Sequence, residues 1–98
     1  MMQDHFLIGR ITRLQIFRAS EFGARASFRL ERPGESSVIC SVADDVAREF
    51  IAHYREGDIV AVTGAFEPRP STASSITPWG GRFRVRTLRA SEVIWLAA

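Results

Sequence analysis

The side chains in this sequence best suited to contact a charged partner are its arginines. All thirteen basic residues are arginine, and there is no lysine. Four of them lie in the stretch RFRVRTLR, as Arg82, Arg84, Arg86 and Arg89. The guanidinium group is planar and weakly hydrated, binds phosphate through paired hydrogen bonds and stacks on nucleobases. This stretch makes nucleic acid the first partner to consider, although the codon usage of a GC-rich genome accounts equally well for the missing lysine.

The charges are also unevenly distributed along the chain. Residues 44–58 carry five acidic side chains against two arginines, a net charge of −3. The remainder carries eleven arginines against six acidic side chains, a net charge of +5. Local fields govern the encounter with a polyanion more than total charge does. The sequence therefore predicts one cationic face on a protein of nearly balanced charge.

The other reactive residue types form no catalytic or metal-binding pattern. His5 and His53 are the only histidines, and neither has a second ligand at metal spacing. Asp44 and Asp45 are better explained as helix caps than as a catalytic pair. The serines of residues 71–75 lack a nearby base, and no glycine motif that could cradle a phosphate is present. We therefore expect a protein that is not an enzyme and that uses no cofactor and no metal.

Length and composition indicate a single small domain. Ninety-eight residues with 46% hydrophobic content suffice for one core, so we expect one domain over residues 1–98. Cys40 is the only cysteine and lies in the apolar stretch SSVICSV, which favours a buried small hydrophobe over a nucleophile. No apolar run approaches the length of a membrane span, and the start MMQDHFLIG does not resemble a signal peptide. A soluble, cytoplasmic protein without membrane contact is expected.

The hydrophobic pattern predicts five strands and one helix. The strands are expected at residues 6–17, 24–30, 37–42, 58–67 and 82–96, and the helix at residues 44–54. Imperfect alternation around Gly9 indicates that the first strand bends or changes its buried face. The second strand alternates cleanly and directs Arg25 and Arg29 outward. The proline, serine and glycine content of residues 69–81 is typical of a long mobile loop.

Local signals mark the ends of these elements. Asp44 or Asp45 is expected to cap the helix, and Gly57 is expected to end it. Pro33 and Gly34 predict a tight turn before the third strand. A helix between the third and fourth of five strands, with glycines in the first and fourth, is the layout of the OB-fold. We therefore predict an all-β protein, a five-stranded OB-fold Greek-key barrel with one α-helix, although other small α+β arrangements share this order.

Four segments resemble, in the same order, the bacterial single-stranded DNA-binding protein family. They are FLIGRIT, FGARASFRL, VAREFIAHYREGDIVAVTGAFEPRP and WGGRFRVRTLRASEVIWL. The resemblance implies sequence-tolerant binding of single-stranded DNA in replication, recombination or plasmid transfer, with RNA not excluded as a ligand. It also implies association into a homodimer or homotetramer.

The sequence departs from the family at the positions where bases are expected to stack. The third strand, ESSVICSV, contains no aromatic residue, and the segment after the fourth strand has only Trp79. The chain stops at IWLAA without the acidic tail through which typical members recruit partner enzymes, so no such recruitment is expected. In size and in the lack of a tail the sequence resembles the primosomal replication protein B branch, or a short accessory protein from a mobile element. Arginine must then supply more of the affinity, which makes binding weaker and more sensitive to salt.

The candidate nucleic-acid-binding residues combine the pattern and the resemblance. Alternation places the first three arginines of RFRVRTLR on one side of the last strand, about 7 Å apart, although a solvated strand face has the same pattern. The complete set is Arg82, Arg84, Arg86, Trp79, Arg69, Arg25, Arg29 and Phe66. Phe66 suits either the groove or the barrel interior, and Trp95 is expected in the core or at a subunit interface. The alternative hypothesis is an OB-fold protein-interaction module with little or no nucleic-acid affinity.

Overall fold

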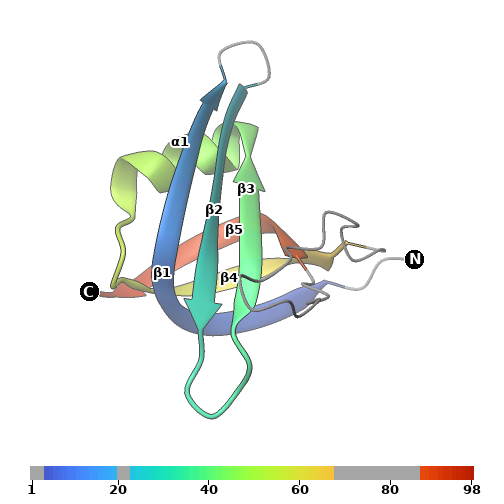
Figure 1. The fold of residues 1–98 in the computed structure, drawn as a ribbon, viewed down its shortest axis with the longest axis vertical. Helices are drawn as coiled ribbons and strands as arrows, with labels where there is room; N and C mark the ends of the chain where they lie inside the picture. The colour runs from blue at the N-terminus through green and yellow to red at the C-terminus, as the bar shows by residue number, and fades with distance from the viewer. Residues whose placement is uncertain (1–3, 20–22, 68–86) are drawn as a thin grey trace, which may run out of the picture.

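The alternation of apolar and polar residues produces a barrel of five strands with one helix packed on it (Figure 1). The computed structural model describes residues 4–19, 23–67 and 87–98. The elements are β1 (His5–Ala19), β2 (Gly23–Glu31), β3 (Val38–Ala43), α1 (Asp44–His53), β4 (Ile59–Phe66) and β5 (Thr87–Ala97). The predicted order is confirmed, while the predicted start of the last strand, residues 82–86, lies outside the described residues.

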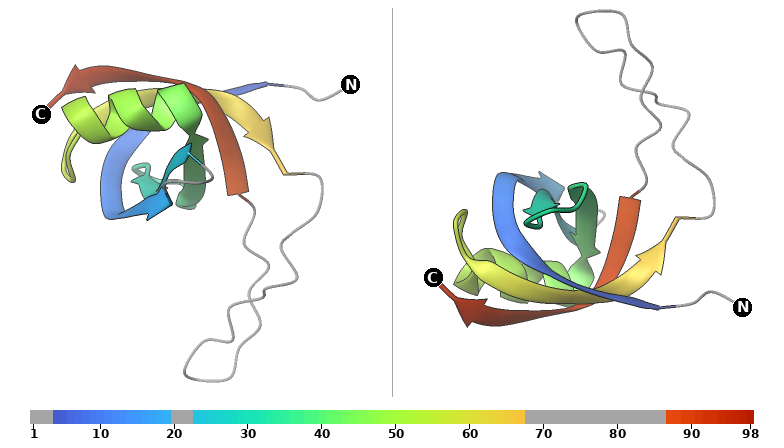
Figure 2. Two further views of the ribbon diagram at one scale, coloured as in Figure 1. Left: turned by 90° about the horizontal axis from the view of Figure 1, so that it is seen from above. Right: turned by 90° about the horizontal axis from the view of Figure 1, so that it is seen from below.

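The strands close into a barrel in the order β1-β2-β3-β5-β4, with β1 hydrogen bonded to β4. The pairs are antiparallel except β3 and β5, which run parallel. Residues 5–10 of β1 pair with β4, and residues 10–19 pair with β2, so this curved strand joins the two halves of the barrel (Figure 2). This is the Greek-key barrel of the OB-fold, and the predicted fold class is confirmed.

A β-bulge allows β1 to serve both halves. The register between β1 and β2 shifts within residues 12–15, where Arg13 adopts a φ of 49°. Ile11 before the bulge and Leu14 after it both contact the core. The extra residue therefore changes which alternate positions point inward. The predicted change of buried face is confirmed, but it occurs after Ile11 and not at Gly9.

Apolar side chains from every strand and from α1 fill the barrel. The largest fully buried ones are Phe28, Phe50, Ile11, Leu30, Leu88, Val60, Val62 and Cys40. Phe28 of β2 and Phe50 of α1 stack with ring centroids 4.7 Å apart, which anchors the helix on the core. Cys40 is confirmed as a buried small hydrophobe, and burial raises the pKa of its thiol to about 12.

The ends of α1 differ from the prediction. Ala43 occupies the N-cap and no side chain caps the helix, so the predicted aspartate cap is wrong. The reason is that β3 runs directly into the helix, which places Asp44 and Asp45 in the first turn, where they still complement the helix dipole. At the other end the C-cap is Tyr54, and Gly57, with a φ of 96°, belongs to the turn that leads into β4. The helix therefore ends before the glycine that was expected to end it.

Two glycines are required by the fold. The predicted turn at Pro33 and Gly34 is confirmed, because Gly34 has a φ of 73° and the Glu35 amide donates a hydrogen bond to the Arg32 carbonyl at 3.2 Å. In β4, a Cβ on Gly64 would overlap the carbonyl oxygen of Arg89 in β5. Glycine at that position permits the close approach that closes the barrel.

Candidate nucleic-acid interface

The outward side of β1, β2 and β3 forms a polar surface, named here the β1–β2–β3 face. Residues of β2 alternate between the core and this face, so that Ala26, Phe28 and Leu30 are buried while Arg25 and Arg29 point outward. Register across the strands gives its rows: Phe17, Arg25 and Ala43; Gln15, Ser27 and Ser41; Thr12, Arg29 and Ile39; Arg10 and Glu31. In OB-folds the strand 2–3 face and its flanking loops bind oligonucleotides.

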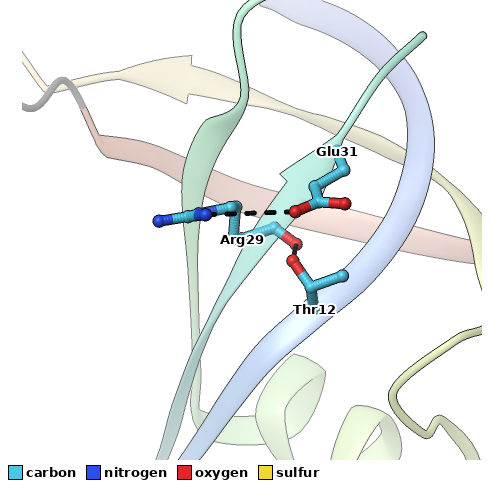
Figure 3. Close-up of polar contacts among 3 residues, drawn as sticks. All are labelled: Thr12, Arg29 and Glu31. Carbon is cyan, nitrogen blue, oxygen red and sulfur yellow. Dashed lines mark hydrogen bonds and ion pairs between the residues drawn. The ribbon is translucent and has the colours of Figure 1, made fainter.

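Arg29 is only weakly held on this face. Its Nη1 lies 3.9 Å from Oε1 of Glu31, and the two side chains are 31% and 51% exposed (Figure 3). The Thr12 hydroxyl donates a hydrogen bond of 3.3 Å to the Arg29 carbonyl, which fixes the backbone and not the guanidinium. A solvated ion pair at this separation contributes less than about 1 kcal/mol. The guanidinium of Arg29 is therefore available to an anionic ligand.

Arg25 is more accessible still. It is exposed, and among the described residues no ion pair includes it. Arg29 is four positions further along the same strand, which corresponds to about 13 Å. The structure thus brings these two predicted site residues together on one surface.

Five predicted site residues lie outside the described residues and stay predictions. They are Arg69, Trp79, Arg82, Arg84 and Arg86. The described residues that flank this segment are paired, because the Glu67 amide donates a hydrogen bond of 2.9 Å to the Thr87 carbonyl. Thr87 also pairs with Ile39 of β3. Glu67 and Thr87 therefore lie side by side next to β3, at the edge of the β1–β2–β3 face.

Phe66 has the contacts of a packing residue. It lies partly buried against the core cluster, and its ring stands edge-to-face against His5 with centroids 4.9 Å apart. The sequence left both the binding groove and the barrel interior open for Phe66, and the structure places its side chain toward the barrel interior. Its role in nucleic-acid binding stays a prediction.

Arg89, the last arginine of RFRVRTLR, is exposed on β5 and forms a surface ion pair. Its Nε lies 3.2 Å from Oε1 of Glu67, and its partner in the neighbouring strand β3 is Ser41. Trp95 is half-exposed near the end of β5. The expectation that Trp95 could be a core residue is therefore wrong, because β5 continues past the part of the barrel that would cover it.

The sequence analysis did not single out Phe17, which the structure places on the β1–β2–β3 face. Its side chain is 51% exposed and lies directly across from Arg25. Without the bulge, Phe17 would share the inward parity of Ile11. The only signal in the sequence was the break in alternation, which did not reveal where the parity changes.

The acidic segment lies behind this face. Residues 44–58 form α1 and the turn before β4, and Figures 1 and 2 place α1 on the far side of the barrel from the outward side of β2. Asp45 and Glu49 of α1 line a shallow depression together with Glu92 of β5. Two acidic residues of the segment lie elsewhere: Asp44 is at the β3 end of the face beside Gly23, and the Glu56 carboxylate accepts a hydrogen bond of 2.7 Å from the Leu14 amide of β1. The predicted separation of charge is thus present for Arg25 and Arg29.

In the described part of the chain, no group of three or more histidine, cysteine, aspartate and glutamate side chains is arranged to hold a metal ion. Within the same residues, no helix has the length and apolar character needed to cross a membrane.

Comparisons with known proteins relate the chain to others through its structure. No protein-family model and no curated protein matches the sequence. A small single-stranded DNA-binding protein from Streptomyces coelicolor superposes with a TM-score of 0.74 at 15% identity, over 97% of this chain and 93% of that one. The single-stranded DNA-binding domain of a Synechococcus protein gives a TM-score of 0.71 at 18% identity, over 96% of both chains.

A third similar structure has a protein as its ligand. The OBody NL8, bound to hen egg-white lysozyme, superposes with a TM-score of 0.67 at 17% identity, over 98% of this chain and 96% of that one. At these identities the likeness establishes a common fold. The resemblance to bacterial single-stranded DNA-binding domains is therefore confirmed for the fold, and the likeness to the primosomal branch stays a prediction. This chain has the OB-fold of the single-stranded DNA-binding domains.

Proposed function

We propose that this protein is a non-enzymatic, sequence-tolerant binder of single-stranded DNA in the cytoplasm. The observation that supports it most directly is the pair of accessible arginines, Arg25 and Arg29, on the face that OB-folds use for oligonucleotides. The protein would act in replication, recombination or plasmid transfer by binding single-stranded DNA, without catalysing a reaction on it.

The composition of the face determines how such binding works. Phosphates of an extended strand contact arginines, and each neutralised phosphate contributes about −0.7 to the slope of log affinity against log salt concentration. Stacking contributes about 1 to 3 kcal/mol per base where an aromatic side chain is available. The described part of the face has one exposed aromatic, Phe17. It also has Arg25, Arg29 and the exposed Arg10, whose Nη1 donates a hydrogen bond to the Gly57 carbonyl, so the electrostatic contribution dominates there. Binding should therefore weaken steeply as salt rises.

Fluorescence anisotropy with labelled oligo(dT) across a salt series tests this proposal. The protein should bind at low salt with a steep negative slope. The double variant Arg25→Ala, Arg29→Ala should lose about 30-fold in affinity, at about 1 kcal/mol per contact, and its slope should become shallower by about 1.4. The matched control is Arg48→Ala, Arg55→Ala, which removes two exposed arginines from the acidic segment and should bind as the wild type does.

The outcomes of this experiment separate the hypotheses. A wild-type protein that gives no response to oligo(dT) at low salt would contradict the proposal. An equal loss in the two double variants would show that Arg25 and Arg29 act only through net charge. Oligo(rU) in the same series decides between DNA and RNA.

We also propose that the protein is a homodimer or homotetramer, joined through the outward side of β1, β4 and β5, named here the β1–β4–β5 face. Phe6 and Ile8 of β1 and Ile94 of β5 are between 44% and 61% exposed on it. Ala61 lies between Ile8 and Ile94 in one cross-strand row, so the apolar side chains adjoin one another. A contiguous patch of this kind marks an interaction site, and a second copy presents the same patch.

The second candidate function is a protein-interaction module. The OBody structure favours it, because in that complex the same fold is bound to lysozyme. On this hypothesis the β1–β2–β3 face has little affinity for nucleic acid, and the oligo(dT) titration is flat. A steep salt dependence that disappears in the Arg25→Ala, Arg29→Ala variant excludes it.

A further inference from the structure

Phe17 is an exposed aromatic side chain in polar surroundings. It is 51% exposed on the β1–β2–β3 face, and the neighbouring row of that face is Gln15 and Ser27. None of the aromatic contacts between described residues includes its ring. A phenylalanine in this position adds little to the core, and its ring face is open to a flat ligand.

Arg25 supplies a cation directly beside this ring. The two residues are cross-strand partners, and the Cβ atoms of such partners are about 4.5 to 5.5 Å apart. Arg25 is exposed, and no ion pair with a described residue engages it; this includes Asp44, the acidic residue at that end of the face. A ligand that carries a flat ring and an adjoining anionic group would contact both side chains together.

We propose that Phe17 and Arg25 form a binding site for one nucleotide of a single strand, with Phe17 stacked on the base and Arg25 bound to the adjoining phosphate. This inference rests on the proposed function, which it deepens by assigning a base-stacking residue. A second protein copy fits the site less well, because an apolar partner would meet the uncharged polar groups of Gln15 and Ser27 and the guanidinium of Arg25. A nucleotide complements both the ring and the charge.

The test compares side chains of similar size with and without an aromatic face. Phe17→Leu keeps an apolar side chain and should lose between about 5-fold and 150-fold in affinity for oligo(dT), the equivalent of about 1 to 3 kcal/mol for one stacked base. Phe17→Trp should retain or improve affinity. The matched control is Ile16→Ala, which truncates the adjacent, 41% exposed residue on the other side of the strand and should bind as the wild type does.

A second probe separates stacking from other effects. An abasic oligomer of the same length keeps the phosphates and lacks the bases, so Phe17→Leu should bind it as tightly as the wild type does. Arg25→Gln should weaken the binding of both probes and make the salt slope shallower by about 0.7, whereas Phe17→Leu should leave the slope unchanged. These two signatures distinguish a stacking residue from a structural one.

Each outcome bears on one of the two proposals. If the wild type binds oligo(dT) and Phe17→Leu binds it equally well, the nucleotide site is wrong and the proposed function stands. An equal loss on both probes also overturns the site, because it assigns Phe17 to folding or to contact between copies. A wild type that binds neither probe overturns the proposed function and the site together. Circular dichroism of each variant establishes that the barrel is folded.

Discussion

The two ends of β1 each present an exposed phenylalanine, but their surroundings differ. Phe6 is 61% exposed on the β1–β4–β5 face, and the adjoining row of that face is Ile8, Ala61 and Ile94. Phe17 is 51% exposed on the β1–β2–β3 face, where its cross-strand partner is Arg25. Exposure alone therefore does not define the function of an aromatic side chain. The cross-strand partner of Phe6 is Thr63, so it is the adjoining apolar row that indicates a second apolar surface there, whereas the cross-strand partner of Phe17, Arg25, indicates an anionic, aromatic ligand.

The largest expected effect is on self-association through the β1–β4–β5 face, at the Phe6 end of β1. Ile8→Glu places a charge at the centre of the proposed contact between copies. An uncompensated buried charge costs about 3 kcal/mol or more, so self-association should weaken at least 100-fold. Light scattering over a range of protein concentrations should then show a monomer where the wild type shows a dimer or tetramer.

Gln15→Glu is the matched control, because it adds the same charge to the same strand on the other face. It should leave the oligomeric state unchanged. Ile8→Glu should in turn keep its affinity for an oligonucleotide short enough to occupy a single barrel, since one OB-fold covers about 4 to 16 nucleotides. A wild type that is monomeric at every concentration would contradict the assignment of the apolar face.

The next effect concerns the bulge that separates the two ends. Arg13 adopts a φ of 49°, a conformation that β-branched residues strongly disfavour and that glycine adopts freely. Arg13→Val should therefore lower the free energy of unfolding by about 1 to 2 kcal/mol, whereas Arg13→Gly should be nearly neutral. Both variants remove the same charge, so the difference between them in urea unfolding reports the backbone strain of valine, reduced by the greater entropy of glycine in the unfolded chain. Equal stabilities would show that residue 13 does not need the left-handed conformation.

The same bulge shows how far the sequence could predict this protein. The order of strands and helix, the OB-fold, the turn at Gly34 and the burial of Cys40 all followed from periodicity and turn chemistry. The position of a bulge depends on pairing with β2, a tertiary property, so alternation alone could not assign Phe17 to a face. The outward positions of Arg25 and Arg29 were predicted because β2 alternates without interruption.

The remaining misses also have tertiary causes. The helix cap was wrong because β3 continues into α1 without a connecting residue, which leaves Ala43 at the cap. Trp95 was expected in the core or at a subunit interface because VIWL is apolar; its 50% exposure excludes the core, and the interface stays a prediction. The row at Arg82, Arg84 and Arg86 falls outside the described residues, so its role rests on the sequence pattern alone.

At neutral pH the smallest effect is expected at Cys40, which lies on β3 between the paired residues Phe28 and Leu88 and is fully buried. Burial raises the pKa of this thiol from 9.0 to about 12, against the opposing influence of Arg32. At a pH between these two pKa values, the thiol is deprotonated in the unfolded chain and protonated in the folded chain. The free energy of unfolding should therefore be independent of this group below pH 9 and fall by about 1.4 kcal/mol per pH unit above it. The difference between wild type and Cys40→Ala in urea unfolding isolates this contribution, and identical pH profiles would contradict it.

Labelling of the Cys40 thiol shows whether the variants at the two faces keep the barrel folded. A buried, protonated thiol should react with a maleimide at pH 8 only when the barrel opens. Ile8→Glu, Gln15→Glu and Phe17→Leu alter exposed positions and should label no faster than the wild type. Rapid labelling of a variant would show that its barrel opens near Cys40 on β3. A loss of binding by that variant would then reflect unfolding. Slow labelling together with a selective loss, of self-association for Ile8→Glu or of base-dependent affinity for Phe17→Leu, would assign the two ends of β1 to different ligands.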